Sequence, residues 1–200
     1  MTKIKFCGLR RTEDIEMANR LMPEYIGFVF WEKSRRYIDG ETAARLKRAL
    51  STDIQAVGVF LDAPFELPLA LLKKGVIDLV QLHGNESEDY IRRLKQETGK
   101  PVIRAMRVAG AEDVKRAQDS IADYLLFDAG AGDGRTFDWA FLKEAARPYF
   151  LAGGLDAGNV GEAVLCLHPY AVDASSGIET DGWKDAEKMA AFADAVREIN

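Results

Sequence analysis

Apolar residues gather along the chain in short runs that are rich in β-branched and aromatic side chains. The runs begin about 20 to 30 residues apart, and each has the length of a strand rather than of a helix. We therefore predict eight strands. They cover residues 3–8, 25–30, 55–60, 78–83, 101–106, 123–128, 149–154 and 171–176.

The segments between these runs show the spacing of amphipathic helices. In the last of them Met189, Phe192, Ala193 and Val196 recur at i, i+3, i+4 and i+7, which places them on one helical face. Thr12 is expected to cap the first helix. This first helix covers 13–22. The other predicted helices cover 41–50, 64–74, a stretch that begins at Asn85 or Ser87, 111–119, 138–147 and 157–167.

Strands that alternate with helices indicate a parallel sheet, because each helix provides a right-handed crossover. Eight such units without an interruption favour a closed (β/α)8 TIM barrel that forms a single domain over residues 1–200. An open doubly wound sheet is the alternative. In a barrel, the carboxyl ends of all eight strands meet at one face, where enzymes of this fold place their active sites.

Composition narrows the class of partner. Hydrophobic residues make up 48% of the chain and charged residues 30%, as in ordinary globular proteins. A net charge of -5 and a pI near 5.2 argue against nucleic acid as a partner. The chain lacks an apolar run of membrane-spanning length and the apolar core of a signal peptide. We expect a cytoplasmic protein without a membrane partner.

Cysteine and histidine are too few and too scattered for a metal site. Cys7 and Cys166 form no CxxC pair, and His83 and His168 form no HxxxH or HExxH pair. A disulfide is not expected in a reducing compartment. Cys166 lies in the apolar stretch AVLCLH and is expected to belong to the core.

Two loops have the composition of a phosphate site. LAGGLDAGNV follows the seventh strand and VDASSGIE follows the eighth, which are the usual phosphate-binding loops of this fold. Gly153 and Gly154 would let backbone amides approach an anion, and Ser175 and Ser176 would add hydroxyl donors. Either loop alone could be an ordinary turn or a helix cap.

The glycine-rich segment FDAGAGDGRTFDW does not fit a nucleotide site. A dinucleotide motif needs glycine where Arg135 stands, and a Walker loop needs glycine where Ala129 stands. We interpret residues 129–136 as a lid that hinges on its glycines, or as a mobile surface loop.

Asp128 is a candidate acid. It ends an apolar strand, and the loss of solvation there is expected to raise its pKa so that it holds a proton near neutral pH. The alternatives are helix capping or a salt bridge with Arg104, Arg107 or Arg135.

Cys7 is a candidate base at the end of the first strand. Arg10, Arg11 or Arg36, together with the start of the first helix, would favour its thiolate. The alternative is a small buried hydrophobic residue. An acid, a base and a phosphate site without a metal or cofactor motif indicate proton transfer on a small phosphorylated molecule. A hydrolase fits less well, because His83 has no evident nucleophile beside it.

Several motifs together resemble the phosphoribosylanthranilate isomerase family of tryptophan biosynthesis. KIKFCGL is similar to its KICG opening and KSRRYI to its SPRY segment. VQLHG, GDGRTFDW, LAGGLDAGNV and DASSGIE resemble its QLHG, GGTGKTFDW, GGL-x-x-x-NV and DVSSGVE motifs. They follow the family's order from residue 3 to about 185, nearly the whole chain.

The resemblance implies a TIM barrel that converts N-(5-phosphoribosyl)anthranilate to an aminodeoxyribulose phosphate by an Amadori rearrangement, without a cofactor. Carried over by motif, Cys7 would be the general base and Asp128 the general acid. Arg36 would hold the anthranilate carboxylate, and His83 and Asp173 would also contact the substrate. The phosphate would be held by Gly153, Gly154, Ser175 and Ser176.

Other interpretations remain open. An indole-glycerol-phosphate synthase would be expected to carry a catalytic lysine on an early strand, and a ribulose-phosphate epimerase would carry metal-binding histidines. A degenerate barrel that serves as a binding module would not need Cys7 and Asp128. We expect a monomer or a homodimer.

Overall fold

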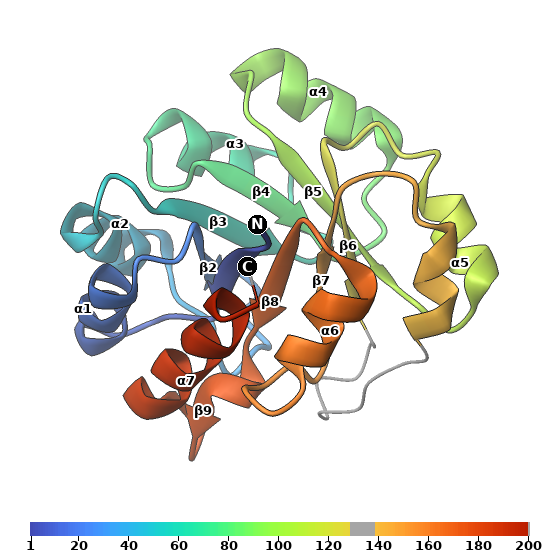
Figure 1. The fold of residues 1–200 in the computed structure, drawn as a ribbon. Helices are drawn as coiled ribbons and strands as arrows, with labels where there is room; N and C mark the ends of the chain where they lie inside the picture. Colours follow the sequence, from blue (N-terminus) through green and yellow to red (C-terminus); the bar gives the residue numbers. More distant parts are fainter. Residues whose placement is uncertain (129–138, 200) are drawn as a thin grey trace.

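The computed structural model describes residues 1–128 and 139–199. Eight parallel strands pair in chain order, and β8 returns to pair with β1 (Figure 1). The barrel is therefore closed, which confirms the predicted fold and excludes the open sheet. The strands are β1 (Lys3–Cys7), β2 (Tyr25–Val29), β3 (Gln55–Phe60), β4 (Leu79–Leu82), β5 (Val102–Arg107), β6 (Tyr124–Asp128), β7 (Tyr149–Leu151) and β8 (Ala171–Ala174).

Helices surround the barrel and cover the outer face of its strands (Figure 1). They are α1 (Thr12–Leu21), α2 (Gly40–Ala49), α3 (Glu66–Lys73), α4 (Glu88–Thr98), α5 (Ala111–Ala117), α6 (Val160–Leu167) and α7 (Ala186–Arg197). Strands in such a barrel are buried on both faces, so they form nearly continuous apolar runs. None of the helices in these described ranges is both long and apolar enough to span a bilayer.

Alternation along β1 separates the barrel interior from the outer core. Ile4 and Phe6 point outward, where Phe6 makes an edge-to-face contact with Phe192 of α7. Lys5 and Cys7 take the opposite, inward direction that follows from the two-residue period of a strand. The inward positions of β1 thus hold the ionisable side chains, and the outward positions pack against the helices.

A layer of tyrosines closes the amino-terminal end of the barrel. The hydroxyls of Tyr25 and Tyr170 are 2.9 Å apart, and that of Tyr170 donates to Tyr124 at 3.3 Å. Lys3 Nζ donates to the Tyr170 hydroxyl at 2.7 Å. The polar tips satisfy one another while the rings fill the interior, so this end of the barrel is a plug.

Four local predictions were wrong. Trp139–Glu144 form the 3-10 helix η1 instead of an α-helix over 138–147; Pro148 disfavours helical conformation at Arg147, so the predicted helix could not continue to that residue. Thr12 is the first helical residue of α1 rather than its cap, since the carboxylate of Asp14 accepts the free amides of Arg10 and Arg11.

The strand β7 ends before the predicted residue 154 because Gly153 and Gly154 have positive φ angles of 93° and 67°. Cys166 is exposed rather than in the core, because α6 turns Val160, Ala163 and Val164 inward and leaves Cys166 on the opposite face. The predicted lid at 129–136 lies outside the described residues.

Candidate active site

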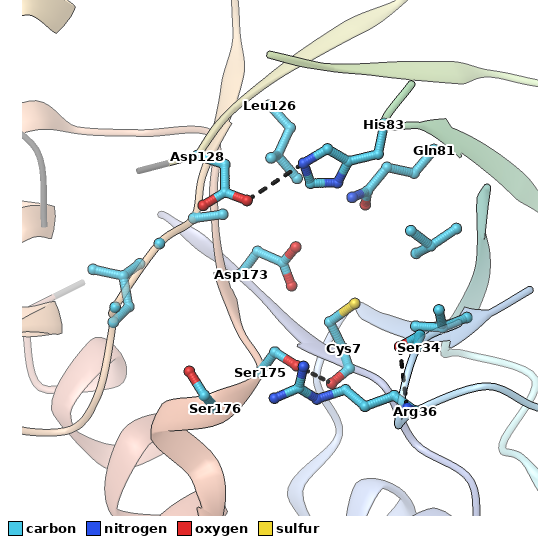
Figure 2. Close-up of a pocket in the computed structure, with 16 residues that line it drawn as sticks. Cys7, Ser34, Arg36, Gln81, His83, Leu126, Asp128, Asp173, Ser175 and Ser176 are labelled. Atoms are coloured by element: carbon cyan, nitrogen blue, oxygen red, sulfur yellow. Dashed lines mark hydrogen bonds and ion pairs between the residues drawn. The ribbon is translucent and has the colours of Figure 1, made fainter. Parts of the chain in front are cut away.

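The carboxyl ends of the strands surround one pocket, which is shown in Figure 2. Every residue assigned to the site from the sequence lines it. They are Cys7, Arg36, His83, Asp128, Gly153, Gly154, Asp173, Ser175 and Ser176. The barrel thus gathers residues from the whole length of the chain. Val29, Val59 and Leu126 give the pocket apolar walls between these polar groups.

Cys7 ends β1 with its side chain only 8% exposed. It fits because its neighbour on β2 is Gly27, where a Cβ atom would lie 2.8 Å from the Cys7 sulfur. The carbonyl oxygen of Cys7 accepts a hydrogen bond from the Ser175 hydroxyl at 3.0 Å. The next residue, Gly8, turns the chain away with a φ of 84°, and a side chain there would collide with Arg36.

The positive charge near Cys7 does not come from the first loop. The guanidinium of Arg10 stacks on Trp183 and donates to the carbonyl oxygen of Arg35, and that of Arg11 pairs with Asp14. The prediction that these two arginines favour the thiolate was therefore wrong.

Burial raises the pKa of the Cys7 thiol above its ordinary value. The ammonium of Lys5 opposes that rise, and Asp173 adds to it. Lys184 also opposes the rise. Neither lysine was assigned to the site from the sequence. The signal for Lys5 was its place as a charged residue between the apolar residues Ile4 and Phe6, at the inward position next to Cys7.

Asp128 ends β6 at the pocket, and its Oδ2 is 3.4 Å from His83 Nε2 of the segment after β4. His83 therefore contacts the candidate acid directly. The predicted alternative of a salt bridge to Arg104 is wrong, because Arg104 Nη1 donates instead to the Glu86 carbonyl oxygen at 2.6 Å and lies 3.4 Å from the Glu86 carboxylate. Arg135 lies outside the described residues.

Two buried oxygen atoms in this region lack a hydrogen-bond partner among the described residues. They are Asp173 Oδ1 and Gln81 Oε1, and both residues line the pocket. The other oxygen of Asp173, Oδ2, accepts from Lys5 Nζ at 2.8 Å. In Figure 2 Asp173 lies between Asp128 and Cys7. Buried acceptors are costly when they are left unpaired, so these two oxygens are candidate binding groups for a hydrogen-bond donor that enters the pocket.

Arg36 is held in place by Glu179. Arg36 Nε and Nη2 donate to the two Glu179 oxygens at 2.7 and 2.8 Å, in the bidentate geometry that suits a guanidinium. Arg35 and Lys184 donate to the same carboxylate at 2.9 and 2.7 Å. Burial would raise the pKa of Glu179, but Arg36 and Lys184 outweigh it and hold that pKa at about 2.

Glu179 and Lys184 belong to a hairpin that was not predicted. It consists of β9 (Glu179–Thr180) and β10 (Trp183–Lys184), joined at Asp181 and Gly182 with φ angles of 52° and 80°. An Asp-Gly pair is a known signal for this turn type, so the sequence did contain the information. The hairpin returns Lys184 to Ser175, which lines the pocket, and Lys184 Nζ donates to the Ser175 carbonyl oxygen at 2.9 Å.

The loops after β7 and β8 lie against each other. A Cβ atom at Gly177 would be 2.0 Å from the Leu155 carbonyl oxygen, so glycine is required for this contact. Asn159 fixes the first loop by donating to the Gly154 carbonyl oxygen at 2.9 Å and accepting from the Asp156 amide. Among the described residues, none accepts a hydrogen bond from the Gly153 or Gly154 amide. These amides are therefore available to an anion.

A model of the N-(5'-phosphoribosyl)anthranilate (PRA) isomerase family matches residues 4–195. The chain belongs to this family. The isomerase of this name from Endomicrobium trichonymphae is 47% identical over 194 residues, which cover 94% of this chain and 95% of the relative. Its counterpart from Thermoanaerobacter sp. (strain X514) is 44% identical over 206 residues, the full length of both chains.

Solved structures of PRA isomerases have the same fold. The crystal structure of the Thermus thermophilus enzyme matches with a TM-score of 0.90 and 35% identity, over 100% of both chains. A PRA isomerase in complex with reduced 1-(o-carboxyphenylamino)-1-deoxyribulose 5-phosphate matches with a TM-score of 0.89 and 32% identity, over 99% of this chain and 100% of the other. The isomerase family predicted from the order of motifs is therefore confirmed.

Gly27 is expected to be essential for the position of the candidate base. In Gly27→Ala the new methyl group displaces the Cys7 sulfur, and a displacement of about 1 Å can lower a rate about 100-fold. We expect this loss in kcat for the isomerase reaction, measured on folded protein. Gly58→Ala is the control, because its Cβ meets Ile77 and Phe60 outside the barrel. It should lower the melting temperature and leave kcat nearly unchanged. Equal kcat in the two variants would contradict this account.

Glu179→Gln is expected to lower stability by about 3–5 kcal/mol at neutral pH, because the buried cations around it lose their counter-charge. The native pKa of about 2 lies below the ordinary value of 4.5, so this stabilisation is complete above pH 4.5 and disappears as the pH falls towards 2. Urea denaturation at several pH values measures it. The exposed control Glu16→Gln should change little. A deficit that stays constant down to pH 2 would contradict the prediction.

Proposed function

We propose that Cys7 and Asp128 catalyse the Amadori rearrangement of N-(5'-phosphoribosyl)anthranilate as general base and general acid. The observation that carries the proposal is that both side chains line one pocket together with the glycine and serine loops after β7 and β8. Cys7 is on β1 and Asp128 on β6, so they approach a bound sugar from different sides of the barrel.

The reaction needs one proton donor and one proton acceptor. Asp128 gives its proton to the furanose ring oxygen, the bond from C1′ to that oxygen breaks, and the nitrogen lone pair forms a C1′=N iminium ion. The cation acidifies the C2′ proton, which the Cys7 thiolate removes to give an enolamine. The enolamine then tautomerises to the ketone. A well-placed acid or base contributes roughly 10²- to 10⁴-fold to the rate.

His83 supports the acid in this scheme. Its Nε2 atom lies 3.4 Å from Asp128 Oδ2, close enough to orient the carboxyl group. We therefore propose that His83 both contacts the substrate and orients Asp128.

The two ends of the substrate are anions, and the pocket offers a group for each. Arg36 lines the pocket while Glu179 holds its Nε and Nη2, so Nη1 remains for the anthranilate carboxylate. The Gly153 and Gly154 amides and Ser176 are proposed to bind the phosphate. Ser175 differs from its predicted role, because its hydroxyl donates to the Cys7 carbonyl oxygen; its contribution to phosphate binding would be through its backbone.

The unpaired oxygens of Asp173 and Gln81 suit the middle of the substrate. A ribose or ribulose chain carries hydroxyl donors between its phosphate and its amine, and each buried acceptor can take one. These oxygens support the proposal that Asp173 binds the substrate, and we extend the proposal to Gln81.

The reaction is an internal redistribution of hydrogen, so it requires no cofactor. We infer a cytoplasmic enzyme, in keeping with a biosynthetic step on a phosphorylated metabolite. We further infer a monomer or a homodimer. A matched structure from Thermotoga maritima, of monomers generated from a dimeric PRA isomerase, has a TM-score of 0.89 at 32% identity and covers 99% of this chain.

Cys7→Ser tests the base. A serine hydroxyl is far less acidic than a thiol, so we expect kcat to fall at least about 100-fold. The loss of phosphoribosylanthranilate fluorescence measures turnover. Cys166→Ser is the matched control, because it removes the exposed cysteine far from the pocket, and it should keep full activity. Wild-type activity in Cys7→Ser would remove the base assignment, and an inactive wild type would refute the proposed reaction.

Asp128→Asn tests the acid. Asparagine keeps the shape but cannot donate the proton, so we expect a severe loss of kcat with KM changed little. Asp123→Asn, at the opposite end of β6, is the control, since Asp123 contacts Lys95 and the Val102 amide away from the pocket. It should affect stability rather than kcat. Unchanged kcat in Asp128→Asn would refute the assignment.

A further inference from the structure

Lys5 is a fully buried lysine that the proposed mechanism does not use. Its side chain is 0% exposed, and its Nζ is 2.8 Å from Asp173 Oδ2. Lys5 and Asp173 are direct partners in the pairing of β1 with β8. An ammonium group inside a barrel loses its hydration at a cost of several kcal/mol, and an apolar pair of similar volume is often at least as stable. Stability alone therefore does not explain why the Lys5–Asp173 ion pair is buried there.

Cys7 provides that reason, because it follows Lys5 by two residues on the same strand and points into the same interior. The charged groups that act on its sulfur come from several elements. Lys5 is on β1, Asp173 on β8 and Lys184 on β10, while Arg36 follows β2. Lys5 carries no exposed surface, so water screens its charge less than that of any exposed group.

We propose that Lys5 is the positioning residue of the active site: its ammonium fixes Asp173 through one carboxylate oxygen and stabilises the thiolate of Cys7. This inference rests on the proposed role of Cys7 as the base. The contact uses only Asp173 Oδ2, and Oδ1 remains an open acceptor beside the pocket. The ammonium of Lys5 thus orients Asp173 toward the substrate and also provides positive charge next to Cys7.

The carboxylate and the thiol compete for this cation. Burial by itself would lower the pKa of Lys5, but Asp173 and Cys7 raise it, so the lysine stays protonated. When Cys7 ionises, its negative charge faces Lys5 and is opposed by Asp173. Removal of Lys5 and removal of the Asp173 charge are therefore expected to shift the pKa of Cys7 in opposite directions.

The test titrates the Cys7 thiol without substrate. The rate of iodoacetamide alkylation is measured against pH in a Cys166→Ser background, which removes the exposed cysteine. Lys5→Met should raise the pKa of Cys7 by about one to two units, and Asp173→Asn should lower it by about one unit. The alkaline rise of kcat/KM in Lys5→Met should move upward by the same amount, with a loss of about tenfold per unit at pH 7.

Lys3→Met is the matched control. Lys3 points inward from the same strand one layer deeper, where it contacts Tyr170 rather than the pocket. It should leave the pKa of Cys7 unchanged. An unshifted pKa in Lys5→Met, or a raised pKa in Asp173→Asn, would overturn the proposal. If Lys5→Met does not fold, the direction of the shift in Asp173→Asn decides. The alkylation readout does not depend on turnover, so failure of the isomerase assignment is detected separately by the assay of Cys7→Ser.

Discussion

The pairing of β8 with β1 is the constraint on which the site depends. It closes the barrel, and in its register Lys5 stands directly opposite Asp173. The same closure brings the Ser175 hydroxyl to the carbonyl oxygen of Cys7. The carboxyl ends of β1 and β8 therefore lie at the same level along the barrel axis. A slip of this register would separate the buried ion pair, and breaking such a pair is strongly destabilising. The interaction that closes the fold thus also aligns the candidate base with Asp173, the carboxylate proposed to bind the substrate.

A second constraint lies at the mouth of the barrel, where one carboxylate organises three cations. Glu179 accepts hydrogen bonds from Arg35, Arg36 and Lys184. The hairpin that carries Glu179 and Lys184 has strands of only two residues each, so on its own it would be only marginally stable. Its ion pairs attach it to the loop after β2. Arg36 consequently reaches the pocket from a fixed direction, which matters because guanidinium recognition of a carboxylate depends on geometry.

The strands and most helices could be predicted from the sequence because a parallel barrel makes them locally visible. Apolar runs of strand length, separated by helical periodicity, follow from burial on both strand faces. The motif order identified the family, and every residue assigned to the site lines the pocket. The predictions that failed depended on tertiary contacts. Cys166 is exposed because of the rotation of α6, and Arg10 turns to Trp183 on a hairpin that was not predicted. Lys5 was overlooked because its partner lies at the other end of the sequence.

The balance of buried charge explains how an acidic chain can bind a polyanionic substrate. The chain has a net charge of -5, yet the charged groups around the pocket include the buried cations Lys5 and Lys184 and the partly buried Arg36, against the buried carboxylates Asp173 and Glu179. Cations in a cleft with low-dielectric walls attract anions more strongly than the same charges on an open surface. The local excess of positive charge is small, however, so the proposed thiolate and the substrate can share it only if each cation is fixed. The two buried carboxylates fix them, and this is the physical reason for keeping acidic residues in a site that binds acids.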